Sequence, residues 1–448
     1  MTKKKLYDIK IESMRYPNLG ISSLGDQKIQ CKGTITGQTV QVRLGRKRGE
    51  YREAKKVQIL EHSPLETMNP CPAFGDCGGC QYQRLPFTTE DALKQKMMEE
   101  LFAEAAPGLT IQRHSNPRPR SYRNKMEYTF GDAYKGGPLV LGLHSAGRFY
   151  EMVDTAGCNI VHPDFEVIRQ GVQDYFRQTG QAFYRKLHHT GLLRHLVIRC
   201  GFHTRELLIN LVTTSQDEVS TEGLIDILLD LPLELNIVGI LHTINDDLAD
   251  AVKADELRTL YGRPYLYERV LGLEFKISPF SFFQPNVFGI ENLYSRLLEL
   301  AGDLSETTVY DLYSGTGTIG MILAKKAHKV IGVEIVEEAV LAARENAVAN
   351  GIKNVEFRSA DVLKELEQLT DPADLIVLDP PRAGIHPKAL EGIISHQPKN
   401  FLYVSCNPKS MAEDLHSFLQ AGYEIKALEW FDQFTRTPHV EALAYISV

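Results

Sequence analysis

The strongest constraint on the fold is an alternation of strands and helices from about residue 280 onward. The apolar segment 308–312 runs into a glycine-containing turn, and a helix is expected from about Gly320 to Lys326. Further strands are expected at 329–334, 355–357, 374–379 and 401–404. Strands and helices that alternate in this way form a parallel, doubly wound sheet. We therefore predict an α/β domain with a Rossmann-like sheet over residues 280–448.

Acidic residues stand at or just after the ends of these strands. They are Asp311, Glu334, Asp361 and Asp379. The turn after the first strand has the Gly-x-Gly-x-x-Gly spacing of dinucleotide sites, with Gly315, Gly317 and Gly320. An acid at 311 would repel a pyrophosphate and attract a cation, so the pattern favours the sulfonium and ammonium of S-adenosylmethionine. We expect Glu334 to accept the ribose hydroxyls and Asp361 to lie near the adenine amino group.

Three cysteines, Cys71, Cys77 and Cys80, lie within ten residues of each other beside glycines that allow a tight turn. Such a cluster in a reducing compartment indicates a metal site. Cys158, in a glycine-containing loop, is the best candidate for a fourth ligand, and Cys31 and Cys200 fit less well because they lie at expected strands. Three clustered thiols and a distant one favour a four-iron, four-sulfur cluster, with structural zinc as the alternative.

The N-terminal residues 1–62 carry short alternating segments broken by glycines, which predict a five-strand antiparallel barrel of the oligonucleotide-binding type. Residues 63–279 are predicted to form a central α/β domain that carries the metal site. Within it, residues from about 81 to 115 are expected to be helical in character, with 88–91 capping a segment of apolar residues at helical spacing. This helix is expected to pack on the cysteine-rich segment. Basic residues gather in two zones, at 43–56 and 113–125, and each zone fits a solvated face as well as it fits phosphate binding. The first zone, on the later strands of the barrel, favours RNA binding by that domain.

Composition sets the broad class of this protein. The 448 residues are 43% hydrophobic and 24% charged, which is typical of globular proteins of two to four domains. The N-terminus is basic at 3–5 and has no apolar run long enough for a signal peptide or membrane span. A net charge of −7 argues against a protein that coats nucleic acid non-specifically. We expect a cytoplasmic monomer without a membrane partner.

Five motifs together resemble those of the RNA uracil-5-methyltransferases, specifically the ribosomal branch with an N-terminal barrel of the TRAM type and an iron–sulfur cluster. They are Cys71-x5-Cys77-Gly-Gly-Cys80 with Cys158, Asp311-Leu-Tyr-Ser-Gly-Thr-Gly-Thr, Asp379-Pro-Pro-Arg382, Ser405-Cys406-Asn407-Pro408 and His439-Val440-Glu441. The resemblance covers nearly the whole chain. It implies methylation of carbon 5 of uridines in 23S ribosomal RNA, with Cys406 as nucleophile and Glu441 as proton acceptor. It also implies that Cys71, Cys77, Cys80 and Cys158 hold a [4Fe-4S] cluster, and that Gln284, Tyr313, Gly315, Glu334 and Asp379 contact S-adenosylmethionine.

The chemistry requires these residue types independently of the resemblance. Carbon 5 of uracil is a weak nucleophile, so a thiolate must first add to carbon 6, and Cys406 supplies it. A base, here Glu441, must then remove the proton from carbon 5. We expect the uracil to be flipped into a pocket, with Phe282, Phe283 or Phe434 stacking on it, and Arg194, His195, Arg123 and Lys125 to contact RNA phosphates.

Two other functions fit parts of the sequence. The Asp379-Pro-Pro-Arg382 motif would also suit an amino-methyltransferase, for which a cysteine is unnecessary. The second alternative is a non-catalytic iron–sulfur protein that binds RNA. We favour this alternative less, because a protein that had lost catalytic activity would not need the Cys406 thiol, the carboxyl group of Glu441 and the strand-end acids.

Overall fold

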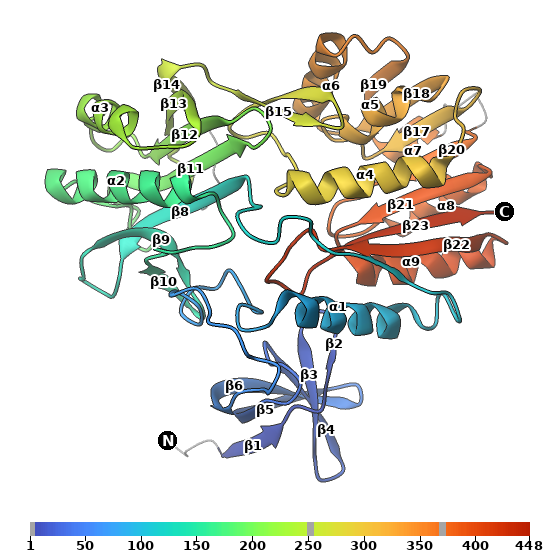
Figure 1. The fold of residues 1–448 in the computed structure, drawn as a ribbon, viewed down its shortest axis with the longest axis horizontal. Helices are drawn as coiled ribbons and strands as arrows, with labels where there is room; N and C mark the ends of the chain where they lie inside the picture. Colours follow the sequence, from blue (N-terminus) through green and yellow to red (C-terminus); the bar gives the residue numbers. More distant parts are fainter. Residues whose placement is uncertain (1–4, 249–254, 367–372) are drawn as a thin grey trace. The chain divides into compact units, whose positions relative to one another are not determined.

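The computed structural model describes residues 5–248, 255–366 and 373–448, so the first part of the basic N-terminal run lies outside the described residues. The chain divides into two compact units (Figure 1). Unit 1 contains Met1–Pro70, Cys80–Asn116 and Leu369–Val448, and unit 2 contains Cys71–Gly79 and Pro117–Gln368. The domain boundaries expected after residues 62 and 279 stay a prediction. Within the described ranges, no helix combines the length and apolar character needed to cross a membrane.

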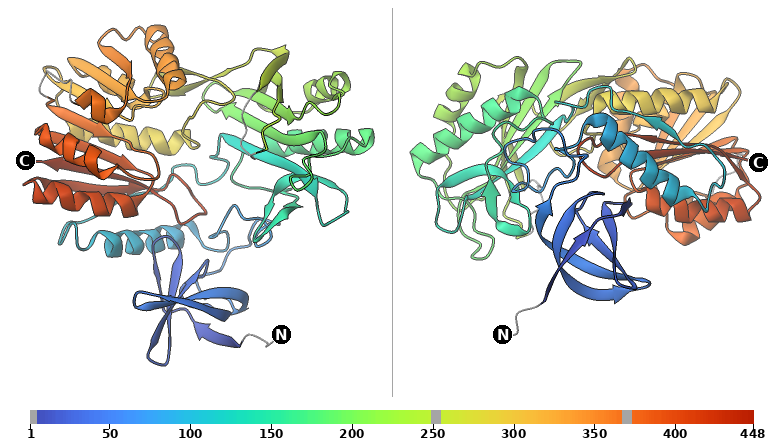
Figure 2. Two further views of the ribbon diagram at one scale, coloured as in Figure 1. Left: turned by 180° about the vertical axis from the view of Figure 1, so that it is seen from behind. Right: turned by 60° about the horizontal axis from the view of Figure 1, so that its bottom comes forward.

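Unit 1 begins with a six-stranded N-terminal sheet. Its strands are β1 (Leu6–Lys10), β2 (Ser13–Arg15), β3 (Leu19–Leu24), β4 (Gln27–Lys32), β5 (Thr39–Arg48) and β6 (Tyr51–Glu61), paired in the order β1-β5-β6-β4-β3-β2. They curl around the buried side chains of Ile9, Ile29, Val40 and Val42 (Figure 2). The expected five antiparallel strands are wrong in number and in one pairing, because β4 and β6 run parallel. The short β2 is the additional strand that alternation alone did not predict.

The rest of unit 1 is a five-stranded group with helices. Its strands are β7 (Gln112–His114), β20 (Leu375–Leu378), β21 (Asn400–Ser405), β22 (Glu424–Phe431) and β23 (Glu441–Ser447), and its helices are α1 (Phe87–Phe102), α8 (Pro387–Ser395) and α9 (Pro408–Gln420). β20 and β21 are parallel, whereas β23 is antiparallel to both β21 and β22. Strand β21 is buried along most of its length, as its run of apolar residues predicts.

Unit 2 contains a seven-stranded sheet in the order β10-β9-β8-β11-β12-β13-β14. The elements are β8 (Lys125–Asp132), β9 (Leu139–Ser145), β10 (Arg148–Val153), β11 (Leu193–Gly201), β12 (Glu206–Thr213), β13 (Asn236–Ile244) and β14 (Glu256–Gly262), with helices α2 (Pro163–Thr179) and α3 (Glu222–Asp230). Every residue of β11 is buried, so this strand forms the centre of the sheet.

The second part of unit 2 alternates strand and helix as expected. After the hairpin of β15 (Leu266–Val270) and β16 (Leu273–Ile277) come α4 (Val287–Ala301), β17 (Thr308–Leu312), α5 (Thr318–Ala324), β18 (Lys329–Glu334), α6 (Glu337–Ala349), β19 (Val355–Ser359) and α7 (Val362–Leu366). The strands β17, β18 and β19 pair in parallel. Their carboxyl ends therefore meet at one edge, which places the loops after β17 and β18 side by side.

Candidate active site

Two glycines in the turn after β17 of unit 2 have different surroundings. Gly317 has φ +76°, and a Cβ there would lie 2.4 Å from Cζ of Phe357, so the side chain is excluded by packing. Gly315 has φ +53°, and a Cβ there would meet nothing within 4 Å. The space over Gly315 is thus open, and bare backbone faces it.

Glu334, at the end of β18, accepts a hydrogen bond from this turn. Its Oε2 accepts a hydrogen bond from the Gly315 amide at 3.0 Å, and its Oε1 accepts one from the Val336 amide at 2.9 Å. These two bonds fix the plane of the carboxylate. Each carboxylate oxygen has a second lone pair, so both can still accept a ligand hydroxyl.

Three other predicted cofactor contacts also belong to unit 2. Oδ1 of Asp361 accepts a hydrogen bond from the Leu363 amide at 3.0 Å and so caps α7. The carbonyl of Gln284 accepts a hydrogen bond from Nδ2 of Asn124 at 2.8 Å, which anchors the turn before α4. Tyr313 has φ +65°, an uncommon conformation for a residue with a side chain. All three lie in loops whose backbone is held by specific contacts.

Cys406 and Glu441 lie side by side in unit 1 because of strand register. Ser405, the last residue of β21, pairs with Ala442 of the antiparallel β23, so residues 406 and 441 face each other at the strand ends. The parallel pairing of Leu378 with Tyr403 brings Asp379 to the same edge. The thiol and two of the predicted acids therefore lie at one edge of the sheet.

Burial raises the pKa values of the acidic groups at this edge. Burial, and secondly the Asp379 carboxyl, raise the pKa of Glu441 well above its usual range. Oε2 of Glu441 is buried and has no hydrogen-bond partner among the described residues. Burial raises the pKa of Asp379 to about 7. Burial, followed by Glu441 and Asp379, raises the pKa of Cys406 to about 11, against the opposing charge of Arg382. An added cation would lower all three pKa values.

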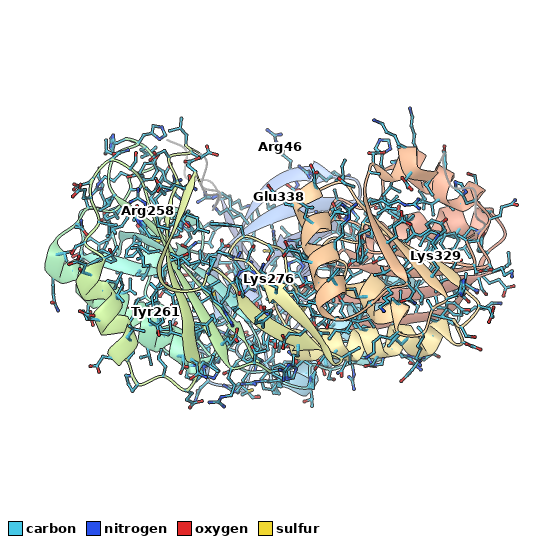
Figure 3. All side chains as sticks on the ribbon, turned by 90° about the horizontal axis from the view of Figure 1, so that it is seen from above. Arg46, Arg258, Tyr261, Lys276, Lys329 and Glu338 are labelled. Carbon is cyan, nitrogen blue, oxygen red and sulfur yellow. The ribbon has the colours of Figure 1, made fainter. Side chains whose placement is uncertain are left out.

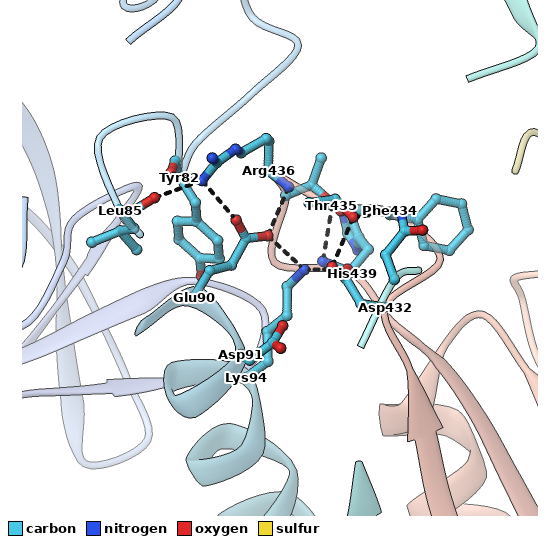
Figure 4. Close-up of polar contacts among 12 residues, drawn as sticks. Tyr82, Leu85, Glu90, Asp91, Lys94, Asp432, Phe434, Thr435, Arg436 and His439 are labelled. Atoms are coloured by element: carbon cyan, nitrogen blue, oxygen red, sulfur yellow. Dashed lines mark hydrogen bonds and ion pairs between the residues drawn. The ribbon is translucent and has the colours of Figure 1, made fainter. Parts of the chain in front are cut away.

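The loop 432–440, which leads into Glu441, is held by buried charges on α1 (Figure 4). Lys94 is fully buried, and its Nζ lies 2.8 Å from Oε1 of Glu90 and 2.6 Å from Oδ1 of Asp432. Burial alone would lower the pKa of Lys94, but Asp432 and Glu90 raise it above its usual value, so the ammonium stays charged. Oδ2 of Asp432 accepts a hydrogen bond from the Thr435 hydroxyl at 2.7 Å.

Arg436 ties the middle of the same loop to the start of α1. It is 2% exposed and has φ +73°. Its amide donates to Oε1 of Glu90 at 2.7 Å, and its Nη1 donates to the carbonyl of Leu85 at 2.6 Å and to Oε2 of Glu90 at 3.2 Å. The guanidinium also lies 3.7 Å from the centre of the Phe87 ring. The four buried charged residues Glu90, Lys94, Asp432 and Arg436, which we call the loop anchor, thus fix the approach to Glu441.

The structure corrects the expectation of helical character from about 81 to 115, because α1 spans Phe87–Phe102 and the strand β7 lies at Gln112–His114. The helix begins at Phe87, so the residues expected to cap it lie inside it, and Glu90 and Asp91 are buried. Its partners in unit 1 are β2, α9 and the loop 432–440. Sequence reasoning missed the loop anchor, because charged residues at helical spacing ordinarily indicate a solvated face.

Comparison with known proteins decides the family. The family model for tRNA (uracil-5-)-methyltransferases matches residues 260–447. A protein of Caldanaerobacter subterraneus subsp. tengcongensis named as an uncharacterized RNA methyltransferase is 43% identical over 450 residues, covering 100% of this chain and 99% of its own. The chain belongs to the RNA uracil-5-methyltransferase family.

Two further comparisons agree with this assignment. A Clostridium tetani protein, also named as an uncharacterized RNA methyltransferase, is 43% identical and covers 99% of this chain and 98% of its own. The crystal structure of Pyrococcus abyssi tRNA (uracil-54, C5)-methyltransferase in complex with S-adenosyl-L-homocysteine superposes with a TM-score of 0.77 at 24% identity, covering 98% of this chain and 100% of that one. The family member described here therefore has a mixed α/β fold with the Rossmann-like structure of S-adenosylmethionine-dependent methyltransferases.

The cysteine-rich segment of this methyltransferase is divided between the units. Cys71, Cys77 and Cys158 belong to unit 2, and Cys80 to unit 1. The thiol of Cys71 raises the pKa of Cys77, after the larger effect of burial, and a Cβ on Gly157 would lie 3.3 Å from Pro72. The loops at 71–79 and 155–158 are thus adjacent. Among the described residues, no three His, Cys, Asp or Glu side chains are placed to hold a metal ion, so the thiols as they stand do not form the expected ligand set.

The predicted RNA contacts of the methyltransferase differ in accessibility. Arg194 and His195 are 2% and 4% exposed, so the prediction that they contact phosphates is wrong. Nη1 of Arg194 donates to the Asn245 carbonyl at 2.7 Å instead. By contrast, the basic zone on β5 is exposed, and Arg46 projects away from the ribbon (Figure 3). A strand-like run of apolar neighbours around Arg194 was the signal that it is buried.

Proposed function

We propose that the protein transfers a methyl group from S-adenosylmethionine to carbon 5 of uridines in 23S ribosomal RNA. The observation that carries this proposal is the placement of Cys406 beside Glu441 at the ends of paired strands. A thiol and a basic carboxylate at neighbouring strand ends are the two groups that this reaction needs. An amino-methyltransferase would need neither.

The reaction follows from these two groups. The Cys406 thiolate adds to carbon 6 of the uracil, and the electron pair displaced from the C5–C6 double bond forms a bond from carbon 5 to the methyl group. S-adenosylmethionine, when bound, would supply that methyl group in electrophilic form, because its methyl–sulfur bond breaks with the electron pair left on sulfur and S-adenosylhomocysteine as the leaving group. The Glu441 carboxylate then takes the proton from carbon 5, the C5–C6 double bond re-forms, and the thiolate leaves. Because burial raises the pKa of Glu441, its carboxylate is a stronger base than one in water.

The residues proposed to bind the methyl donor differ in what they can contribute. Glu334 has a fixed carboxylate for the ribose hydroxyls, and Gly315 leaves space for the ligand beside it. Asp379, whose pKa is raised to about 7, would gain most from a cationic group nearby. Gln284, Tyr313 and Asp361 lie in anchored loops and are the remaining proposed contacts.

Trapping with 5-fluorouracil tests the proposed chemistry, because fluorine at carbon 5 cannot be removed as a proton. We expect S-adenosylmethionine and a 5-fluorouracil-containing 23S rRNA transcript to give a covalent protein–RNA adduct that survives denaturation. The Cys406→Ala variant should form none while keeping the circular dichroism spectrum of the wild type. An adduct that persists in Cys406→Ala, or methylation at an exocyclic amine, would contradict the proposal.

The choice of RNA is tested in the same experiment. The Pyrococcus abyssi neighbour is named as acting on uracil 54 of tRNA, so a fluorinated tRNA transcript is the proper comparison. We expect the 23S transcript to be the faster substrate. If only tRNA forms the adduct, the reaction stands and the assignment to ribosomal RNA is wrong.

A [4Fe-4S] cluster held by Cys71, Cys77, Cys80 and Cys158 is a separate proposal. It is supported by the adjacency of the 71–79 and 155–158 loops and by their glycines. We expect anaerobically purified protein to contain about four iron and four sulfide per chain. Cys77→Ser should lose this iron, whereas Cys31→Ser, which changes a buried thiol of the N-terminal sheet, should keep it. One zinc ion per chain in place of iron would favour the alternative metal.

A further inference from the structure

Arg382 lies on a loop that is built against the loop of the nucleophile. Asn407, the residue after Cys406, donates a hydrogen bond from its Nδ2 to the Arg382 carbonyl at 3.1 Å. Gly384 has φ +85°, and a Cβ there would lie 3.0 Å from Cβ of Ser410, so the loop after β20 packs closely on the start of α9. These two contacts hold the backbone of Arg382 beside the residues that follow the thiol.

The guanidinium of Arg382 lies on the face of the His439 ring. Its Nη2 is 3.4 Å from Nδ1 and 3.4 Å from Nε2 of that ring. A nitrogen in the plane of the ring and equally far from both would collide with the carbon between them, so this contact is stacking and not a hydrogen bond. Arginine stacks readily on flat aromatic rings. The His439 ring thus determines where the charged end of Arg382 lies.

His439 is itself held in place and uncharged. Its amide donates to Oγ1 of Thr437 at 3.3 Å, and the Thr437 hydroxyl donates to the Phe434 carbonyl at 2.7 Å, within the loop that the loop anchor holds (Figure 4). Burial, followed by the charge of Arg382, lowers the pKa of His439. The ring is therefore neutral at neutral pH and does not repel the guanidinium.

Both supports of Arg382 adjoin the reacting groups. Asn407 follows Cys406, His439 precedes Glu441 by two residues, and the pairing of β21 with β23 sets Cys406 opposite Glu441. The guanidinium is therefore held at the edge of the sheet that carries the thiol. Burial, which raises the pKa of Cys406 to about 11, is opposed by the charge of Arg382, as expected for a cation at this edge.

We propose that Arg382 is the cation that stabilises the Cys406 thiolate, and that His439 is a positioning residue that holds the Arg382 guanidinium by stacking. This inference rests on the proposed function, in which the thiolate adds to carbon 6 of uracil. The thiol loses its proton to solvent, and an electron pair of sulfur then forms the bond to carbon 6. The guanidinium keeps all its protons and contributes only its charge. Without it, burial would leave little thiolate at neutral pH.

Alkylation of Cys406 by iodoacetamide tests the role of Arg382, because the thiolate is the reactive form. We expect Arg382→Gln to lower the rate at neutral pH about three- to tenfold, as for a thiol pKa that rises by about half to one unit. Mass spectrometry of the Cys406 peptide separates this thiol from the others. Lys399→Gln is the matched control, because Lys399 is exposed and precedes β21, whereas Cys406 follows it.

The ratio of the alkylation rates at neutral and alkaline pH separates charge from access, since changed access scales both rates alike. Only Arg382→Gln should lower this ratio relative to the wild type, and Lys399→Gln should keep it. Equal ratios for the two variants would overturn the inference. If Arg382→Gln keeps the ratio and instead raises KM for RNA, Arg382 contacts RNA and its proposed role is wrong.

Two substitutions test the role of His439. His439→Phe keeps a flat ring under the guanidinium and should retain the wild-type ratio, whereas His439→Ala removes the ring and should approach Arg382→Gln. Each is measured below its own melting temperature. Equal ratios for His439→Phe and His439→Ala would overturn the positioning role. Alkylation needs neither RNA nor S-adenosylmethionine, so a wild type that forms no fluorouracil adduct contradicts the proposed function without deciding these ratios.

Discussion

Replacing Glu441 with glutamine is expected to lower methyl turnover by about 100- to 10,000-fold, the usual range for loss of a general base, and to leave the covalent RNA adduct in place. The thiolate of Cys406 can still add to carbon 6 of ordinary uracil in this variant, and the methyl group can still be transferred. The proton on carbon 5 then has no acceptor, so the thiolate cannot be expelled. Unmodified RNA should therefore accumulate as a methylated adduct, which the wild type releases.

The measurement is single-turnover kinetics with labelled S-adenosylmethionine, in which protein-bound and free methylated RNA are separated. Glu429→Gln is the matched control, because Glu429 is a buried glutamate of the neighbouring β22 that pairs with His114 at 2.7 Å. That variant should lose stability without accumulating the adduct. If Glu441→Gln releases product at the wild-type rate, Glu441 is not the base.

The Glu441→Gln variant is also expected to change the free energy of unfolding, by an amount that depends on pH. Glu441 has a higher pKa when folded than when unfolded, mainly because it is buried. Between the unfolded pKa of about 4.3 and the folded pKa, the native state binds more protons than the unfolded state. This group therefore lowers stability as the pH rises through that window. Glutamine removes the effect, so Glu441→Gln should be at least as stable as the wild type in urea at neutral pH, and its advantage should shrink toward pH 4.

Much of the alternating α/β region was predictable, because strand periodicity and strand-end acids are local signals. Gly317 shows a limit of this reasoning. Its position in a Gly-x-Gly-x-x-Gly pattern suggested a ligand, but the packing of Phe357 already excludes a side chain there. Cys406 lies beside Glu441 because of the antiparallel register of β21 and β23. The two motifs do not predict this register by themselves, and only the family resemblance suggested that the two residues act together.

Contacts between distant segments could not be predicted from patterns. Lys94 and Asp432 are separated by 338 positions, and the sequence around either residue gives no sign that the two side chains are in contact. For Arg194 the sequence suggested a contact that the structure does not allow. We predicted an RNA contact from its positive charge, but the residue lies at the start of an apolar strand and is buried.

Replacing Lys94 with methionine is expected to destabilise unit 1 by about 3–5 kcal/mol, the usual cost of removing one partner from a buried ion pair. Methionine keeps much of the volume, so the loss comes from the carboxylates of Glu90 and Asp432, which stay buried without their shared cation. Lys96→Met is the matched control, because Lys96 is exposed on the same helix, and its effect should stay within about 0.5 kcal/mol.

The double variant Lys94→Met/Asp432→Asn separates charge from packing. Removing the second charge should recover part of the lost stability in urea denaturation, since an amide costs less to bury than an unpaired carboxylate. Because the loop anchor fixes the approach to Glu441, Lys94→Met should also slow release of the methylated adduct more than its formation, below the temperature at which it unfolds. If Lys94→Met matches Lys96→Met in both stability and release, the buried charges do not hold the catalytic loop, and the β21–β23 register alone must place Glu441.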